Sequence, residues 1–325
     1  MKQFIFKVIF FCLLFYFLIY FIIRDVNKKI GFNNELEYKV QELVKSAKKS
    51  KIIVLAGDSR AERQLIPRLI SEKVGVKCVN LGVSSGELIS FLPYLKLFNP
   101  DSTFFVFSVS SFQINDKVIS PGYLSLDAYN AFNFFERCYL YRSNIHELLK
   151  MEQQLIKYTF NSLFRRGHNF YIPNKEKKMM ILNLGYLKRD CELKRNYLNS
   201  LFRKNRHIWY KDVYLYGNKL KLFKNAINII AARGYKGIFY QPPICPSWKK
   251  IIKNSKIDRT EINFSNILRQ CTKKKKNLYF FDFYSNPLII FSDTMFCDAQ
   301  HLNTQGAIPF SNLISELIKQ YYTIK

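Results

Sequence analysis

The stretch Lys51-Ile-Ile-Val-Leu-Ala-Gly-Asp-Ser-Arg60 decides the fold that we expect for this chain. Its apolar run is typical of a buried strand that ends at Gly57, and helical spacing of apolar residues begins soon afterwards. The same succession recurs, with strands expected at 51–56, 76–81, 103–109, 237–241 and 277–283 and helices at 61–73, 85–98, 219–233, 261–272 and 303–322. Strands that alternate with helices predict a parallel sheet covered on both faces.

Residues 4–23 form an almost unbroken apolar segment, interrupted only by Lys7. Twenty helical residues span roughly 30 Å, which is the thickness of the hydrocarbon core of a bilayer. No small-x-small cleavage site follows, because the segment ends in Ile22-Ile23-Arg24-Asp25. We therefore expect a retained single-pass transmembrane anchor at residues 1–25. Basic residues flank it on both sides, so charge does not fix its orientation.

The rest of the chain divides into a charged stalk, expected at residues 26–50, and one folded α/β domain at 51–325. Within this domain, the stretch from about 120 to 215 is rich in Tyr, Phe, Lys and Arg and lacks clean periodicity. We interpret it as a largely helical insertion over the carboxyl edge of the sheet.

The chain carries 51 Lys and Arg residues against 24 Asp and Glu, a formal net charge of +27. This excess favours anionic neighbours such as lipid headgroups, surface polymers or nucleic acid. A drift toward A/T-rich codons would produce the same excess, and charge alone does not separate the two explanations. The aromatic and basic stretch 197–214 carries no recognised nucleic-acid motif, so we expect no nucleic acid partner.

The seven cysteines are widely scattered and include no C-x-x-C pair. This pattern indicates neither a zinc site nor a redox motif, and it does not indicate a disulfide framework.

Two short motifs at opposite ends of the domain carry residues suited to nucleophilic catalysis. Ser59 lies just past the first strand, where a helix begins, and a serine there needs a base within hydrogen-bond reach. Of the four histidines, only His301 has a carboxylate three residues before it, Asp298. Asp298 could accept the Nδ1 proton of His301 and direct Nε2 toward Ser59. The plainer interpretations are a helix cap at Ser59, an ordinary turn at 298–301, or a metal site that includes Cys297 but lacks a third ligand.

The order of these motifs resembles that of the SGNH (GDSL-like) hydrolases over residues 51–116 and 219–322. Gly57-Asp58-Ser59 is similar to their first block, Asn80-Leu81-Gly82 to the second, and Asp298-Ala-Gln-His301-Leu-Asn-Thr-Gln-Gly306 to the last. The resemblance implies a flavodoxin-like three-layer sandwich with a five-stranded parallel sheet. It also implies that Ser59, His301 and Asp298 are catalytic, that Gly82 supplies an oxyanion-hole N–H, and that no cofactor or metal is needed.

One block departs from the family pattern. Where G-x-N-D is usual, this chain has Ser108-Val109-Ser110-Ser111, so Ser110 falls at the position of the oxyanion asparagine. Asn115-Asp116 follows a few residues later as an alternative donor. Losing one oxyanion donor typically costs about 10²–10³ in rate.

The anchor, the basic surface and the variant block resemble the membrane-tethered O-acyltransferases of this superfamily. This implies an acyl-enzyme on Ser59 and an acylated glycan or anionic surface polymer of the cell envelope as substrate. A membrane acyl-donor protein is a further candidate partner, and the domain is expected outside the cytoplasm. The alternative is a catalytically inactive relative that binds glycan or acts as an envelope scaffold.

Overall fold

The structure, a computed structural model, describes residues 35–44, 50–84, 86–115, 182–193, 198–200 and 215–322, together with isolated positions within 3–18, 137–154 and at 179. Five strands form one parallel sheet in the order β2-β1-β3-β4-β5. They are β1 (Ile52–Gly57), β2 (Lys77–Asn80), β3 (Thr103–Ser108), β4 (Lys236–Gln241) and β5 (Leu278–Asp282). The predicted α/β fold with a five-stranded parallel sheet flanked by helices is confirmed.

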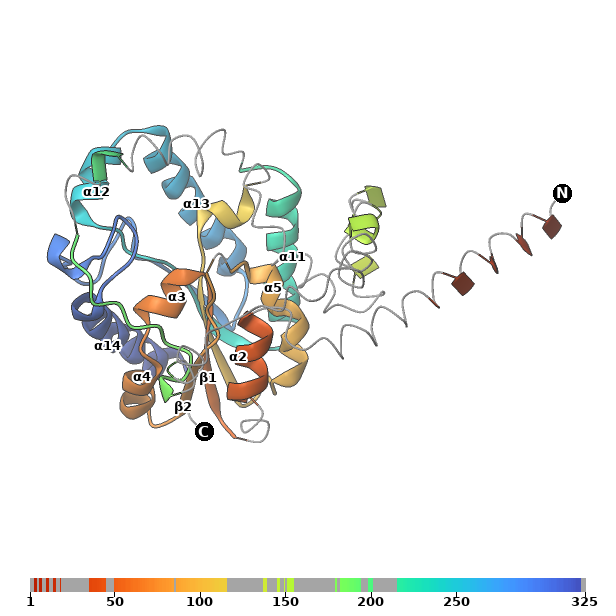
Figure 1. Ribbon diagram of the computed structural model, residues 1–325, viewed down its shortest axis with the longest axis horizontal. Helices are drawn as coiled ribbons and strands as arrows, with labels where there is room; N and C mark the ends of the chain where they lie inside the picture. The colour runs from red at the N-terminus through yellow and green to blue at the C-terminus, as the bar shows by residue number, and fades with distance from the viewer. Residues whose placement is uncertain are drawn as a thin grey trace.

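Helices cover both faces of the sheet (Figure 1). Those bearing on one face are α2 (Glu35–Val44), α5 (Leu88–Phe91), α11 (Asn218–Ala232) and α13 (Lys256–Lys273). Those on the other are α4 (Pro67–Val74), α12 (Pro246–Ile252) and α14 (Thr304–Tyr321), while the short α3 (Ser59–Gln64) follows β1. Because side chains alternate along a strand, Val54 and Ala56 enter the first core and Ile53 and Leu55 the second.

Two expected helices are shorter than their apolar spacing indicated. The expected helix at 61–73 is divided into α3 and α4, because Ile66 is extended and Pro67 begins the second helix. The expected helix at 85–98 is reduced to α5 and a 3₁₀ turn, Leu92–Leu97, that contains Pro93.

Part of the expected stalk belongs to the core of the domain. Leu36, Val40 and Leu43 of α2 are buried in the cluster that also contains Val79 of β2. Among the described residues no helix is long and apolar enough to cross a membrane. The predicted anchor at 1–25 and the insertion at 120–215 lie largely outside the described residues.

A buried ionic cluster joins α2 to α3 and to the loop that contains Gly82. The Lys39 Nζ lies 2.8 Å from Glu62 of α3 and 2.8 Å from Glu35, and it donates to the carbonyl oxygen of Gly82 at 2.5 Å. The side chains of Lys39 and Glu62 are fully buried. Burial raises the pKa of Glu35 to about 8. Burial also acts to raise the pKa of Glu62, but Lys39, the hydrogen bond with Glu35 and the charge of Arg63 together outweigh it and lower that pKa. One ammonium group therefore holds the Glu62 carboxylate and the Gly82 loop together.

We expect Lys39→Met to lower the free energy of unfolding by about 3–5 kcal/mol, because the buried Glu62 carboxylate loses its closest cation and keeps only Arg63, at 3.5 Å. Urea unfolding followed by circular dichroism measures this loss. Lys319→Met is the matched control, since Lys319 pairs with Glu316 while 45% exposed and should change the stability by less than about 1 kcal/mol. Equal effects of the two substitutions would contradict a structural role for the buried cluster.

Candidate active site

The turn after β1 depends on a glycine. Gly57 has a φ of +129°, and a Cβ at this position would lie 2.3 Å from the carbonyl oxygen of Ser108 on the adjacent β3. Only glycine fits such a backbone at this separation. The turn leads directly into α3, whose first residue is Ser59 and whose N-cap is Asp58.

The loop before α14 is folded around Asp298. Its Oδ1 accepts the backbone N–H groups of Gln300 and His301, both at 2.9 Å, and the Cys297 N–H donates to the His301 carbonyl at 2.8 Å. A carboxylate that binds nearby N–H groups closes a tight turn. This turn holds Asp298 and His301 with their side chains against each other.

The structure brings together the three side chains that the sequence singles out. The Ser59 Oγ lies 2.8 Å from the Nε2 of His301, across 242 residues of sequence. The Nδ1 of His301 lies 2.9 Å from both carboxylate oxygens of Asp298. This is the order of contacts that a serine nucleophile, a general base and an orienting acid require. Their role in catalysis stays a prediction.

The charge of Asp298 suits that role. Burial disfavours its ionisation, but the hydrogen bonds from His301 and from the backbone N–H groups of Gln300 and His301 outweigh burial, so its pKa lies well below the usual range. The carboxylate is therefore ionised at neutral pH and accepts the Nδ1 proton of His301.

Both expected oxyanion donors have acceptors within the protein. The Gly82 N–H donates to the Asn80 side chain at 2.9 Å, and the Ser110 hydroxyl donates to Asp58. Asp58 is buried and also accepts from Ser108 and from the backbone and guanidinium of Arg60. The oxyanion role of Gly82 and Ser110 stays a prediction that requires each donor to share or exchange its bond. Asn115 is buried, and Asp116 lies outside the described residues.

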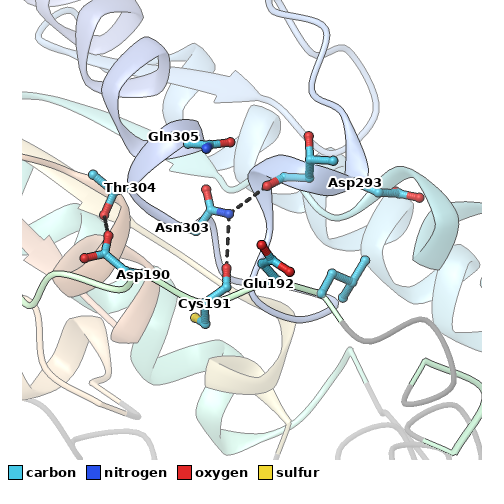
Figure 2. A pocket seen from close by; sticks show the side chains of 9 residues that line it. Asp190, Cys191, Glu192, Asp293, Asn303, Thr304 and Gln305 are labelled. Atoms are coloured by element: carbon cyan, nitrogen blue, oxygen red, sulfur yellow. Dashed lines mark hydrogen bonds between the residues drawn. The ribbon is translucent and has the colours of Figure 1, made fainter.

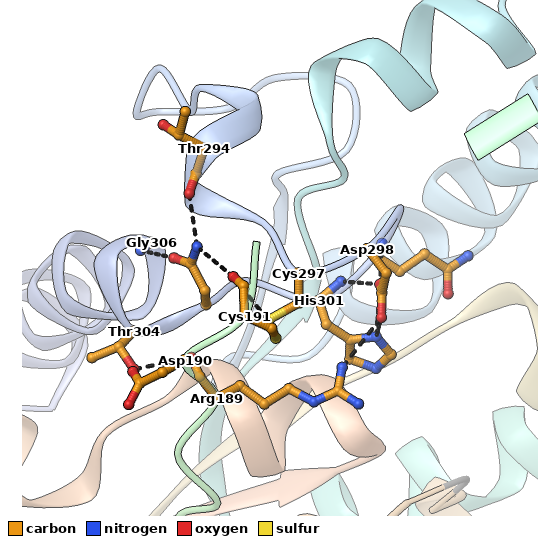
Figure 3. Close-up of a disulfide and its surroundings, with 11 residues drawn as sticks. Arg189, Asp190, Cys191, Thr294, Cys297, Asp298, His301, Thr304 and Gly306 are labelled. Carbon is orange, nitrogen blue, oxygen red and sulfur yellow. Dashed lines mark hydrogen bonds and ion pairs between the residues drawn. A yellow bond between two sulfur atoms is a disulfide. The ribbon is translucent and has the colours of Figure 1, made fainter. Parts of the chain in front are cut away.

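Sequence reasoning missed two features that contact the candidate triad. The Arg189 Nη1 lies 3.2 Å from the Oδ2 of Asp298, and a disulfide joins Cys191 to Cys297, the residue before Asp298 (Figure 3). The cysteine pattern, which indicated no disulfide framework, gave no sign of this pair. Because the two cysteines are 106 residues apart and their pairing depends on the fold, spacing could not reveal it.

A cavity of about 710 Å³ lies beside the disulfide (Figure 2). Residues Asp190 to Leu193 form one side, and Asp293, Thr294 and the start of α14 form the other. Ser59, Asp298 and His301 are not among its lining residues. The three carboxylates of Asp190, Glu192 and Asp293 contrast with the basic composition of the whole chain.

Comparison with known proteins gives no family model and no curated protein that matches this chain. Among solved structures, a candidate platelet activating factor from Streptococcus pneumonia is similar with a TM-score of 0.44 and 10% identity, over 90% of this chain and 92% of that one. A candidate acylhydrolase from Bacteroides fragilis is similar with a TM-score of 0.38 and 12% identity, over 89% of this chain and 98% of that one.

We expect the double variant Cys191→Ala/Cys297→Ala to lose about 2–4 kcal/mol of unfolding free energy, because the disulfide closes a loop of more than one hundred residues. Urea unfolding under non-reducing conditions measures the loss. Cys271→Ala removes a half-buried free thiol and is the matched control. Unchanged stability of the double variant, or wild-type protein whose two thiols both react with iodoacetamide, would contradict this prediction.

Proposed function

We propose that the chain is a serine-dependent esterase or O-acyltransferase of the SGNH type. The observation that carries this proposal is the continuous line of contacts from the Ser59 hydroxyl through His301 to Asp298. A serine at the carboxyl end of a central strand, with a base and an acid from the loop before the last helix, matches the motif order described above. The similar solved structures share too little identity to add to this argument.

In the proposed reaction His301 Nε2 removes the proton of Ser59 as Oγ attacks the carbonyl carbon of an acyl ester. The tetrahedral intermediate collapses to an acyl-serine, and His301 returns the proton to the departing alcohol. A water or a sugar hydroxyl, deprotonated in turn by His301, then attacks the acyl-serine. As the bond from Oγ to the acyl carbon breaks, His301 returns that proton to Ser59 and the acid or the new ester leaves. Asp298 stabilises the imidazolium formed in both steps and stays ionised.

A glycan is the acceptor that the surroundings favour over a polyanion. The cavity beside the Cys191–Cys297 disulfide, which the triad residues do not line, carries three carboxylates, whose field repels an anionic polymer and tolerates a neutral, hydroxyl-rich chain. We therefore place an acylated or acyl-accepting envelope glycan ahead of a teichoic-acid-like polymer.

The alternative function, a catalytically inactive glycan-binding or scaffold protein, has its own supporting observation. Ser110 stands where the family's asparagine would be, and its hydroxyl donates to buried Asp58. The Gly82 N–H is also bonded to Asn80. If neither the Gly82 N–H nor the Ser110 hydroxyl donated to the oxyanion, the rate of acyl transfer would fall by several orders of magnitude.

Labelling with a fluorophosphonate probe separates the two functions. We expect covalent labelling of the wild-type chain, no labelling of Ser59→Ala, and labelling slowed about 10²–10⁴-fold in His301→Ala, because the general base is lost. Ser292→Ala, which removes an exposed hydroxyl bonded to Thr294, is the matched control and should label normally. Folded wild-type protein that does not label would favour the binding function.

The compartment follows from the same proposal. We place the domain outside the cytoplasm because a disulfide between Cys191 and Cys297 persists in oxidising environments, in keeping with the expected membrane anchor. An alkaline phosphatase reporter fused to the C-terminus should be active in cells. Activity of a cytoplasm-dependent reporter alone would contradict this placement.

A further inference from the structure

One segment from the aperiodic part of the chain crosses the three stretches that make up the candidate site. We call residues 184–191 the site strap. Its Leu184 carbonyl accepts the N–H of Asn80 at 2.8 Å, its Leu187 N–H donates to the Glu62 carbonyl at 3.2 Å, and its Arg189 carbonyl accepts the N–H of Thr304 at 2.9 Å. The strap thus bonds to the end of β2, to α3 and to the start of α14.

The backbone of the strap is held closely against the sheet. Gly185 has a φ of +93°, and a Cβ there would lie 1.9 Å from the carbonyl oxygen of Asn80. The Tyr186 side chain is buried. These contacts fix the backbone of the strap relative to β2 and α3, so the Arg189 side chain that follows begins from a defined position.

Arg189 is the strap residue that contacts the candidate triad. Figure 3 shows its side chain extending toward Asp298 and His301. Its Nη1 lies 3.2 Å from the Oδ2 of Asp298, with the Arg189 side chain 34% exposed and that of Asp298 26% exposed. Within the described part of the chain, the other groups that hydrogen-bond the Asp298 carboxylate belong to its own loop.

The disulfide fixes both ends of this ion pair. Cys191 lies two residues after Arg189, and Cys297 lies directly before Asp298. The Thr304 hydroxyl also donates to Asp190 at 2.6 Å. A surface ion pair is usually weakened by the entropy of ordering two long side chains. Here the backbones that carry the two charges are already joined, so less of that cost remains.

We propose that Arg189 is a positioning residue for the Ser59–His301–Asp298 site, and this inference rests on the serine-dependent function proposed above. Its guanidinium holds the Asp298 carboxylate against the Nδ1 of His301. With the carboxylate held in this place, the imidazole keeps its orientation and Nε2 stays directed at Ser59.

Other charged groups nearby are paired with one another. On the turn between β1 and α3, Asp58 bonds Arg60 at 2.9 Å, and on the strap, Lys188 bonds Asp190 at 2.6 Å. Arg189 is the strap residue whose charge is paired with the candidate triad, through Asp298.

The test measures both the rate constant of fluorophosphonate labelling of Ser59 and the fraction of protein labelled, at pH 7 in the full-length chain. We expect Arg189→Met to slow labelling about tenfold, since a hydrogen bond to a charged group is lost, while all of the folded protein still becomes labelled. A merely structural role would lower the labelled fraction without changing the rate constant of the protein that does label.

Two further variants separate charge from hydrogen bonding. Arg189→Lys keeps the charge and should keep most of the wild-type labelling rate, whereas Arg189→Gln keeps a donor without charge and should slow labelling as Met does. Lys188→Met removes the neighbouring exposed cation, and we expect it to label within about twofold of wild type. If Arg189→Met fails to fold, the contrast between Gln and Lys decides.

The failure of this inference and the failure of the proposed function look different. Folded Arg189→Met and Arg189→Gln that label with the wild-type rate constant would overturn the positioning role, while Ser59-dependent labelling would still support the enzyme. Wild-type protein that does not label, or labels equally in Ser59→Ala, would overturn the proposed function and the positioning role with it.

Discussion

The hydrogen bond between Ser59 and His301 is the interaction on which the candidate site depends, and the parallel sheet is what makes it possible. The two residues are separated by 242 positions, yet their Oγ and Nε2 atoms lie 2.8 Å apart. In a parallel sheet every strand delivers its carboxyl end to the same edge, so loops from the two ends of a domain can meet there. Any change that displaced β1 relative to the loop before α14 would separate the nucleophile from its base.

Several buried polar contacts hold that edge in place. Asp58 caps α3 and accepts the hydroxyls of Ser108 and Ser110 from β3 and its loop. The Asn80 side chain donates to the carbonyl of Ala61 at 2.7 Å and of Leu65 at 3.0 Å, which joins β2 to α3. These groups occupy the donors that the family resemblance assigns to an oxyanion. The same bonds that make the site rigid therefore compete with its proposed chemistry. Whether Gly82 and Ser110 can leave these bonds for an oxyanion decides between the enzyme and the inactive binding protein.

The fold was largely predictable from the sequence because the inner strands β1, β3 and β4 are buried on both faces. A run such as Thr103–Ser108, buried throughout, has no polar side to confuse the pattern. Ser59, Asp298 and His301 could be singled out from local spacing, since only one histidine has an acid three residues before it. That these three residues lie close together could not be read from local spacing, because Ser59 and His301 meet only in the folded sheet.

The features that sequence reasoning missed depend on tertiary contacts. Arg189 lies in a stretch without periodicity, and its partner Asp298 is 109 residues away. The helix α2 carries a lysine in its buried face, which local patterning assigns to a solvated stalk, and Glu62 compensates that charge only in the folded protein. The pairing of Cys191 with Cys297 likewise depends on the path of the strap.

The disulfide also has a consequence for the order in which the molecule matures. Cys191 emerges from the ribosome 106 residues before Cys297, and β4 and β5 are synthesised in between. A thiol oxidase can therefore join the pair only after the second half of the sheet exists. Until then the growing polypeptide carries the Ser59 hydroxyl and the Arg189 guanidinium but lacks the His301 imidazole, so the proposed acyl transfer cannot begin on an incomplete chain.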